Sequence, residues 1–210
     1  LKTGLFGAEP WSNKLREQIE AELHITAYDN YGLTEVMGPG VAFECEERDG
    51  LHINEDHFIA EIIDPDSLEA LPVGNKGELV LTTISKEGFP IIRYRTGDIT
   101  RFTGDGCRCG RSLTRMERVS GRTDDMLFLD GIKFFPSQIE EVLLEIEGVQ
   151  AHYHLELDRI KGEDRLTIHV EMEESVFSDE TRKLERLRDS IRESVRSRIG
   201  VDAEVSLKEP

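Results

Sequence analysis

Residues 28–35 read Tyr-Asp-Asn-Tyr-Gly-Leu-Thr-Glu and follow a short strand signal at Ile25–Tyr28. The turn after this strand would present the ring of Tyr31, the hydroxyl of Thr34 and the carboxylate of Glu35. These groups suit stacking on a base, hydrogen bonding to a phosphate and holding Mg²⁺, a cation that prefers oxygen ligands. The alternative is a plain strand and turn with an incidental Thr-Glu cap, because short motifs often match by chance.

The residues before this segment predict an α/β arrangement. Residues 1–7 read as a strand that runs into a glycine turn, and Trp11–Leu23 predicts a helix with Ser12 as its cap. One face of this helix would carry Leu15, Ile19 and Leu23. Residues 1–37 contain too few strands to close a sheet alone, so we expect a piece of a larger α/β domain.

After Gly38 the pattern changes to short alternating segments that are typical of β-structure. The predicted strands are Val41–Cys45, Leu51–Ile53, Phe58–Ile63, Gly77–Thr83 and Asp98–Phe102. Turn sequences separate them, for example Arg48-Asp49-Gly50. We predict a β-barrel-like subdomain over residues 38–121, so that residues 1–121 form the carboxyl-terminal part of one large domain.

Residues 122–210 predict a small α+β domain, which would act as a lid. Asp130-Gly131 lies between two apolar segments, Met126–Leu129 and Ile132–Phe135, and is a strong signal for a hairpin turn with positive φ. A helix would begin at Pro136. The remaining predicted elements are strands at 149–157, 166–172 and 203–207 and a helix at 179–199.

Composition excludes several classes of protein. The 210 residues are 38% hydrophobic and 33% charged, which is typical of a globular domain. With 43 acidic and 26 basic residues the net charge is −17, which argues against nonspecific binding to nucleic acid. The longest apolar runs, such as Glu78–Leu81, are too short to span a membrane. No secretory signal pattern opens the chain, so we expect a cytoplasmic protein.

Two further motifs could contact a nucleotide. Arg93-Tyr94-Arg95-Thr96-Gly97-Asp98 places Asp98 where its carboxylate could accept two hydrogen bonds from a ribose diol. The alternative is an ordinary turn aspartate beside surface arginines. Gly121-Arg122-Thr123-Asp124-Asp125 lies where the two domains should meet and suggests a hinge, since hinges absorb backbone rotation at few residues. A capped turn is the alternative reading of this segment.

Taken together, the three motifs resemble in order and spacing the core motifs of the adenylate-forming superfamily, which includes acyl-coenzyme A ligases, luciferases and peptide-synthetase adenylation domains. Within it, Tyr28–Glu35, Arg93–Asp98 and Gly121–Pro136 are most similar to the phenylacetate–coenzyme A ligase family. The segments Gly50–Phe58 and Glu61–Pro65 strengthen that match. The resemblance covers nearly the whole chain.

The resemblance implies a binding site for ATP and AMP. The segment Gly7, Ala8, Glu9 and Pro10 would line one face of adenine. Asp29 would bond the adenine amine, Tyr31 would stack and Gly32 would let the backbone approach the ligand. Thr34 would contact the α-phosphate, Glu35 would hold Mg²⁺, Asp98 would hold the ribose hydroxyls and Arg122 would lie near the ribose or phosphate.

The resemblance also implies domain movement and a missing partner segment. Asp124 would be the hinge between adenylation and thioester formation, and Gly131 would lie on a hairpin that moves toward coenzyme A. The family's phosphate-binding loop should lie before residue 1, and its catalytic lysine should follow the last residues, so that Lys208 does not take that role. We therefore expect a fragment that is inactive without the amino-terminal part of the enzyme.

Three cysteines predict either a metal site or simple packing. Cys107 and Cys109 form a close pair, and Cys45 lies on a predicted strand next to the one that carries His52. Three thiolates and one imidazole would complete a tetrahedral zinc site. His57 is a competing ligand, and buried cysteines without a metal are the alternative.

The expected function is activation of phenylacetate, or a related aryl acid such as indoleacetate or a benzoate, as an acyl-adenylate and its transfer to coenzyme A. Both steps need charge stabilisation at phosphate more than acid–base chemistry. The alternative is a noncatalytic module that binds a nucleotide or an acyl-coenzyme A and has a regulatory role. A homodimer is compatible with the sequence, which does not determine the oligomeric state.

Overall fold

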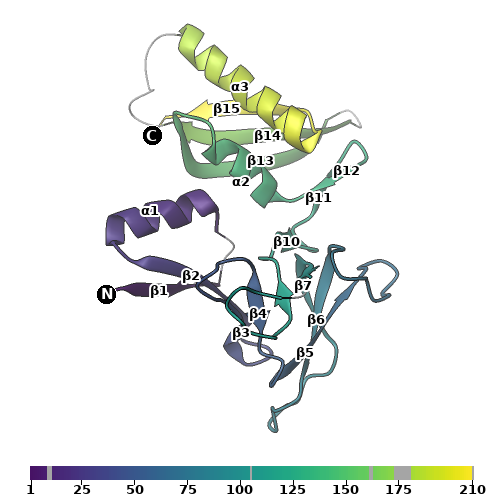
Figure 1. Cartoon of the computed structure of the whole chain (residues 1–210). Helices are drawn as coiled ribbons and strands as arrows, with labels where there is room; N and C mark the ends of the chain where they lie inside the picture. The colour runs from purple at the N-terminus through teal and green to yellow at the C-terminus, as the bar shows by residue number, and fades with distance from the viewer. Residues whose placement is uncertain (9–10, 105, 161–162, 173–180, 210) are drawn as a thin grey trace. The chain divides into compact units, whose positions relative to one another are not determined.

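The computed structural model describes residues 1–8, 11–104, 106–160, 163–172 and 181–209 (Figure 1). Its contacts divide the chain into two compact units, Leu1–Asp124 and Asp125–Pro210, which are described separately below as unit 1 and unit 2. This division lies three residues after the boundary that the sequence suggested between 121 and 122. Among the described residues, no helix is both long and apolar enough to cross a membrane.

The first sheet of unit 1 has six strands in the order β1-β2-β3-β4-β9-β8. Their bounds are β1 Thr3–Phe6, β2 Thr26–Leu33, β3 Gly38–Glu44, β4 Leu51–Ile53, β8 Phe102–Thr103 and β9 Arg115–Met116. β2 pairs in parallel with β1 and antiparallel with β3. One sheet therefore crosses the predicted division at residue 37, because β2, which ends before it, pairs with β3, which begins after it.

Helix α1, Asn13–Leu23, follows β1 and begins as expected at Ser12, whose hydroxyl oxygen accepts a hydrogen bond from the Leu15 backbone N–H at 3.1 Å. The predicted apolar face of this helix is not buried. Leu15 is 41% exposed and Leu23 is 60% exposed, whereas Arg16 is buried. The helix is present as expected, but its buried side chain is that of Arg16, which forms an ion pair with Glu44, and not that of a leucine.

The second sheet of unit 1 has the order β10-β7-β6-β5. Its strands are β5 Phe58–Ile63, β6 Gly77–Thr83, β7 Tyr94–Thr100 and β10 Gly121–Arg122. Both sheets of unit 1 are open, so the expected barrel is corrected to two open sheets. They share a core that includes Ile53 and Leu81, and closure is unnecessary because residues of both sheets already bury each other.

Unit 2 is a two-stranded hairpin and a three-stranded sheet with two helices, as the α+β pattern predicted. Its elements are β11 Leu127–Leu129, β12 Ile132–Phe134, α2 Pro136–Leu144, β13 Val149–Ile160, β14 Glu163–Met172, α3 Thr181–Ile199 and β15 Ala203–Lys208. Residues 179–180 of the predicted second helix lie outside the described residues. Alternate residues of β14, such as Ile168, join both helices in one core.

The hairpin of unit 2 turns at Asp130 and Gly131, whose φ angles are 50° and 86°. Two successive positive φ angles are the geometry that an Asp-Gly pair favours between two antiparallel strands. β11 and β12 pair in the register that this two-residue turn requires, with Leu129 opposite Ile132. The sequence signal for this turn is therefore confirmed.

We expect Ile191→Ala to lower the free energy of unfolding by about 2–5 kcal/mol, because Ile191 is fully buried and its truncation leaves a cavity. Urea unfolding of the whole chain, followed by circular dichroism, measures this change. Leu157→Ala is the matched control, since Leu157 is 43% exposed and should cost much less. Equal losses in both variants would contradict the described core.

Candidate nucleotide-binding site and cysteine cluster

A cavity of about 450 Å³ in unit 1 brings together the three sequence motifs. From residues 28–35 it is lined by Asp29, Tyr31, Gly32, Thr34 and Glu35. Gly7 and Ala8 line it after β1, and Asp98 and Arg122 line it from β7 and β10. Segments that are far apart in the sequence thus meet at one hollow.

Four of the predicted cofactor-site residues are not placed in this cavity. Glu9 and Pro10 lie outside the described residues. Gly131 belongs to unit 2, where it forms the hairpin turn. Asp124 does not line the cavity but contacts it indirectly, since its carboxylate accepts hydrogen bonds from Arg122 Nε at 2.9 Å and from Arg122 Nη2 at 3.1 Å.

Asp98 is the centre of the polar wall of the cavity. Its Oδ2 accepts a hydrogen bond from the Tyr31 hydroxyl at 2.6 Å, and its Oδ1 accepts one from Arg122 Nη1 at 3.0 Å. The Asp98 backbone N–H donates to Thr96 Oγ1 at 3.0 Å. These bonds join β2, β7 and β10, so each of the three motifs supplies one member of a single network.

The electrostatics of this network follow from its burial. Burial raises the pKa of Asp98, and the Tyr31 hydroxyl and the Arg122 guanidinium oppose that shift. Burial also raises the pKa of Tyr31, and the neighbouring Asp98 carboxylate raises it further. Tyr31 therefore stays protonated and remains a hydrogen-bond donor to the carboxylate at neutral pH.

A second network holds another part of the cavity wall and was not predicted from the sequence. The Arg118 guanidinium pairs with Asp29 Oδ2 at 3.1 Å and with Glu44 Oε1 at 3.3 Å. Glu44 also accepts hydrogen bonds from Arg16 Nη2 at 2.8–2.9 Å and from the Asp29 backbone N–H at 2.8 Å. Because these partners are separated by many residues, no local motif could indicate them.

Trp11 covers this second network. The guanidinium carbons of Arg16 and Arg118 lie 4.9 Å and 5.4 Å from the centre of its ring, within the range of cation–π attraction. The Phe6 ring also packs against the indole, with the two ring centres 5.2 Å apart. Burial raises the pKa of Asp29, and the nearby indole N–H of Trp11 opposes the shift.

Two glycines of the cavity wall are required by backbone contacts. A Cβ on Gly32 would lie 2.2 Å from the Gly38 carbonyl oxygen, and one on Gly7 would lie 2.2 Å from the Asn30 carbonyl oxygen. Gly32 follows Tyr31 at an irregular position in the pairing of β2 with β3. The sequence reasoning assigned Gly32 to close approach of a ligand, whereas the close approach observed is that of a neighbouring strand.

Thr34 and Glu35 lie in the turn that follows β2 and are both exposed. The Glu35 backbone carbonyl accepts a hydrogen bond from Lys86 Nζ at 3.2 Å, which connects this turn to the loop after β6. Val36, the next residue, is fully buried and anchors the turn in the core. The turn is therefore held in place where Thr34 and Glu35 line the cavity.

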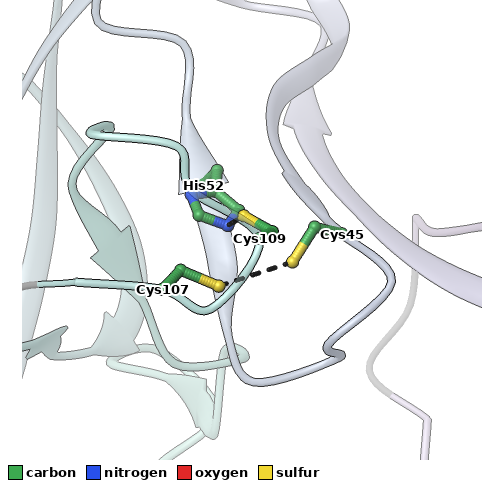
Figure 2. Close-up of side chains that lie close together, drawn as sticks. All are labelled: Cys45, His52, Cys107 and Cys109. Carbon is green, nitrogen blue, oxygen red and sulfur yellow. Dashed lines mark hydrogen bonds between the residues drawn. The ribbon is translucent and has the colours of Figure 1, made fainter.

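The cysteines form a second cluster in unit 1, with Cys107 and Cys109 from the loop between β8 and β9 facing Cys45 and His52 (Figure 2). One donor atom from each residue lies within 4.8 Å of all the others. Cys45 Sγ is 3.6 Å from Cys107 Sγ, and Cys109 Sγ is 3.5 Å from His52 Nε2. His57, the competing candidate, instead contacts Ser85 Oγ at 2.6 Å through its Nδ1.

Comparison with known proteins places these features in a family. Residues 131–210 match the model of the AMP-binding enzyme C-terminal domain. The chain is 44% identical over 208 residues to the phenylacetate–coenzyme A ligase of Escherichia coli, covering 99% of this chain and 47% of the relative. It is 46% identical over 212 residues to that of Aromatoleum evansii, covering 100% of this chain and 48% of the relative.

Solved structures agree with the sequence relatives. A 2-hydroxyisobutyryl-CoA ligase, in its postadenylation state with R3-HIB-AMP, superposes with a TM-score of 0.90 at 29% identity, over 100% of this chain and 45% of that one. The chain is homologous over its whole length to one part of the adenylate-forming ligases, and the three sequence motifs meet in its cavity. Within that class it is a homologue of the phenylacetate–coenzyme A ligases and corresponds to their carboxyl-terminal half. It spans about half the length of these relatives.

We expect Glu44→Gln to lower the free energy of unfolding of the chain by about 3–5 kcal/mol, because Arg16 would lose its buried partner. Chemical unfolding monitored by Trp11 fluorescence measures this loss and reports on the same wall. Glu46→Gln is the control, since the Glu46 side chain is 65% exposed and its pair with Arg111 is screened by solvent and should contribute little. A Glu44 variant as stable as the Glu46 variant would refute the role of the network.

Proposed function

We propose that this chain is the carboxyl-terminal part of an ATP-dependent ligase that activates phenylacetate, or a related aryl acid, and transfers it to coenzyme A. The acid carboxylate attacks the α-phosphate of ATP, which gives an acyl-adenylate and pyrophosphate. The thiol of coenzyme A then attacks the acyl carbon, and AMP leaves. The single observation that carries this proposal is the meeting of all three nucleotide motifs in one cavity of unit 1.

The Asp98 network supports a role in holding the ribose of the nucleotide. A carboxylate accepts hydrogen bonds from both hydroxyls of a diol, and Asp98 is oriented for this by Tyr31 and Arg122. Each bond to a charged acceptor contributes more than a neutral one. Tyr31 would add a ring face for the base, and Arg122 would add positive charge near the phosphate.

The second network, which holds Asp29, supports a role of this part of the cavity in binding adenine. The Asp29 carboxylate is fixed by Arg118, and one oxygen of a paired carboxylate can still accept a hydrogen bond from the exocyclic amine of a base. Gly7 and Ala8 line the same cavity and would face the ring. A flat glycine-bearing segment suits this contact because it adds no bulky side chain.

Thr34 and Glu35 are proposed to contact the phosphates and Mg²⁺. The fit rests on the chemistry of the pair, because Mg²⁺ is bound through one or two carboxylates and the phosphate oxygens of its substrate. Glu35 is exposed and lines the cavity, so its carboxylate is accessible to a hydrated ion. When bound, the ion would neutralise phosphate charge, and Thr34 would donate its hydroxyl hydrogen to a phosphate oxygen.

Asp124 and Gly131 are proposed to serve a movement between the two half-reactions. Asp124 is the last residue of unit 1, so few contacts cross the chain at this point. Among the structures similar to this chain, the 2-hydroxyisobutyryl-CoA ligase has been solved with 2-HIB-AMP and CoA in the thioesterification state. Gly131, with its positive φ, would let the hairpin backbone approach the pantetheine arm of coenzyme A.

The proposed partner of the chain is the amino-terminal part of the same enzyme in the cytoplasm. Several large apolar side chains of unit 1 remain exposed, including Leu5 at 72% and Phe89 at 83%. Packing of another segment on these side chains would remove apolar area from water. A partner that supplies the acid pocket would explain both this surface and the size of the relatives.

We expect a chimera, in which this chain replaces the carboxyl-terminal half of the Escherichia coli ligase, to convert phenylacetate, ATP and coenzyme A to phenylacetyl-coenzyme A, AMP and pyrophosphate. Liquid chromatography of the thioester and of AMP measures this reaction. Acetate in place of phenylacetate is the control for the acid. A chimera that AMP protects against heat, but that turns over no aryl acid, would contradict the proposal and favour the noncatalytic module.

In the same chimera, Asp98→Asn should weaken AMP binding roughly 10- to 150-fold, since a hydrogen bond to a charged group contributes about 1.5–3 kcal/mol. Titration calorimetry measures the affinity. Asp56→Asn removes an exposed carboxylate of unit 1 that does not line the cavity, and it should bind AMP as the parent does. Equal affinities for the two variants would remove Asp98 from the proposed site.

A further inference from the structure

The cysteine cluster has the dimensions of a tetrahedral metal site. Bonds of about 2.3 Å to sulfur and about 2.0–2.1 Å to nitrogen place two sulfurs about 3.8 Å apart and a sulfur and a nitrogen about 3.6 Å apart. Two edges of the cluster agree with these values, with 3.6 Å between Cys45 Sγ and Cys107 Sγ and 3.5 Å between Cys109 Sγ and His52 Nε2. All four donor atoms are thus positioned around one common centre.

The alternatives to a metal fit these atoms less well. The three cysteines are free thiols, and the sulfurs are separated by far more than the bond length of about 2.0 Å in a disulfide. His52 is fully buried, and its Nε2 lies 3.5 Å from Cys109 Sγ, which is a weak hydrogen-bond partner. Burial of a polar ring with so few bonds is costly unless a ligand compensates for it.

We propose that Cys45, His52, Cys107 and Cys109 bind one zinc ion. Three thiolates and an imidazole are a donor set that selects zinc over magnesium or calcium, which prefer oxygen. Donor atoms that lie within 4.8 Å of one another enclose a single ion and leave no room for an iron–sulfur cluster. Four protein ligands fill the coordination sphere, so the ion has a structural role and takes no part in substrate chemistry.

Cationic side chains around the cluster match the charge of the proposed site. Three thiolates and one Zn²⁺ ion leave one net negative charge. The Arg115 guanidinium is buried and donates to the carbonyl oxygens of Gly106 at 2.9 Å and Gly104 at 3.4 Å, which belong to the loop that carries two of the cysteines. It also pairs with Asp49 Oδ2 at 2.8 Å. Arg115 therefore places positive charge beside the sulfurs and fixes their loop.

The site would tie the long loop between β8 and β9 to two neighbouring strands of the first sheet. Cys45 directly follows β3, His52 lies in β4, and the other two ligands come from the long loop between β8 and β9. A loop of this length is costly to order by backbone contacts alone, and an ion that closes it offsets this entropy. Cys45 also follows Glu44, so the ion would restrain the residue that holds Asp29 and Arg118.

Metal analysis of the purified 210-residue chain, prepared without chelators, tests the proposal. We expect about one zinc per chain, as a closed four-ligand site requires. Replacement by Co²⁺ should give the strong visible and near-ultraviolet absorption of a tetrahedral cobalt thiolate. Removal of the metal with a strong chelator should lower the thermal midpoint by more than about 5 °C, because ion binding contributes to folding.

Matched variants identify the ligands. Cys107→Ser should lose the zinc and the cobalt spectrum, and it is less disruptive than a change at buried Cys45 because Cys107 is partly exposed. His52→Gln should weaken zinc binding at least tenfold. His57→Gln should keep the full zinc content, since His57 contacts Ser85 and not the cluster.

Two outcomes would overturn the proposal. The first is a folded chain that binds no zinc when zinc is supplied and whose three thiols all react with a thiol reagent in the native state. The second is an octahedral cobalt spectrum that is the same in the parent and in Cys107→Ser. Either result is independent of ligase activity, so the zinc site and the proposed function can fail separately.

Discussion

Unit 1 depends on the interactions of one buried group, the Glu44 carboxylate. It is buried at the end of β3 and receives hydrogen bonds from helix α1, from the backbone of β2 and from Arg118, which follows β9. A buried carboxylate requires such partners, because an unpaired charge in the interior is strongly unfavourable. The same requirement aligns Asp29 and Arg118 on the wall of the cavity. The same buried charge therefore stabilises the fold of unit 1 and positions two residues of the candidate binding site.

Local signals in the sequence were sufficient for most elements and for the main residues of the cavity. The Asp130-Gly131 turn, the Ser12 cap and strands such as Gly77–Thr83 depend on neighbouring residues only, and these predictions were confirmed. The three nucleotide motifs were found for the same reason, since each is contiguous. Their meeting in one cavity was implied by family resemblance and is now a geometric observation.

The sequence does not show which residues that are distant along the chain contact one another. Arg118 and Trp11 were missed because their partners lie in other strands and helices. The open sheets were mistaken for a barrel because alternation of apolar residues determines the face of a strand and not whether the sheet closes. Periodicity likewise placed Leu15, Ile19 and Leu23 on one face of α1, but it does not show that the buried side chain of this helix is Arg16, which pairs with a distant glutamate.

The adjacency of Glu44 and Cys45 has a consequence for how such chains diverge. Glu44 is the last residue of β3 and Cys45 follows it, so one peptide unit joins the carboxylate that holds Asp29 and Arg118 to a member of the cysteine cluster. An insertion or deletion between them would displace one group relative to the other. Related chains that keep both the carboxylate network and the cysteine cluster therefore have to inherit this junction intact.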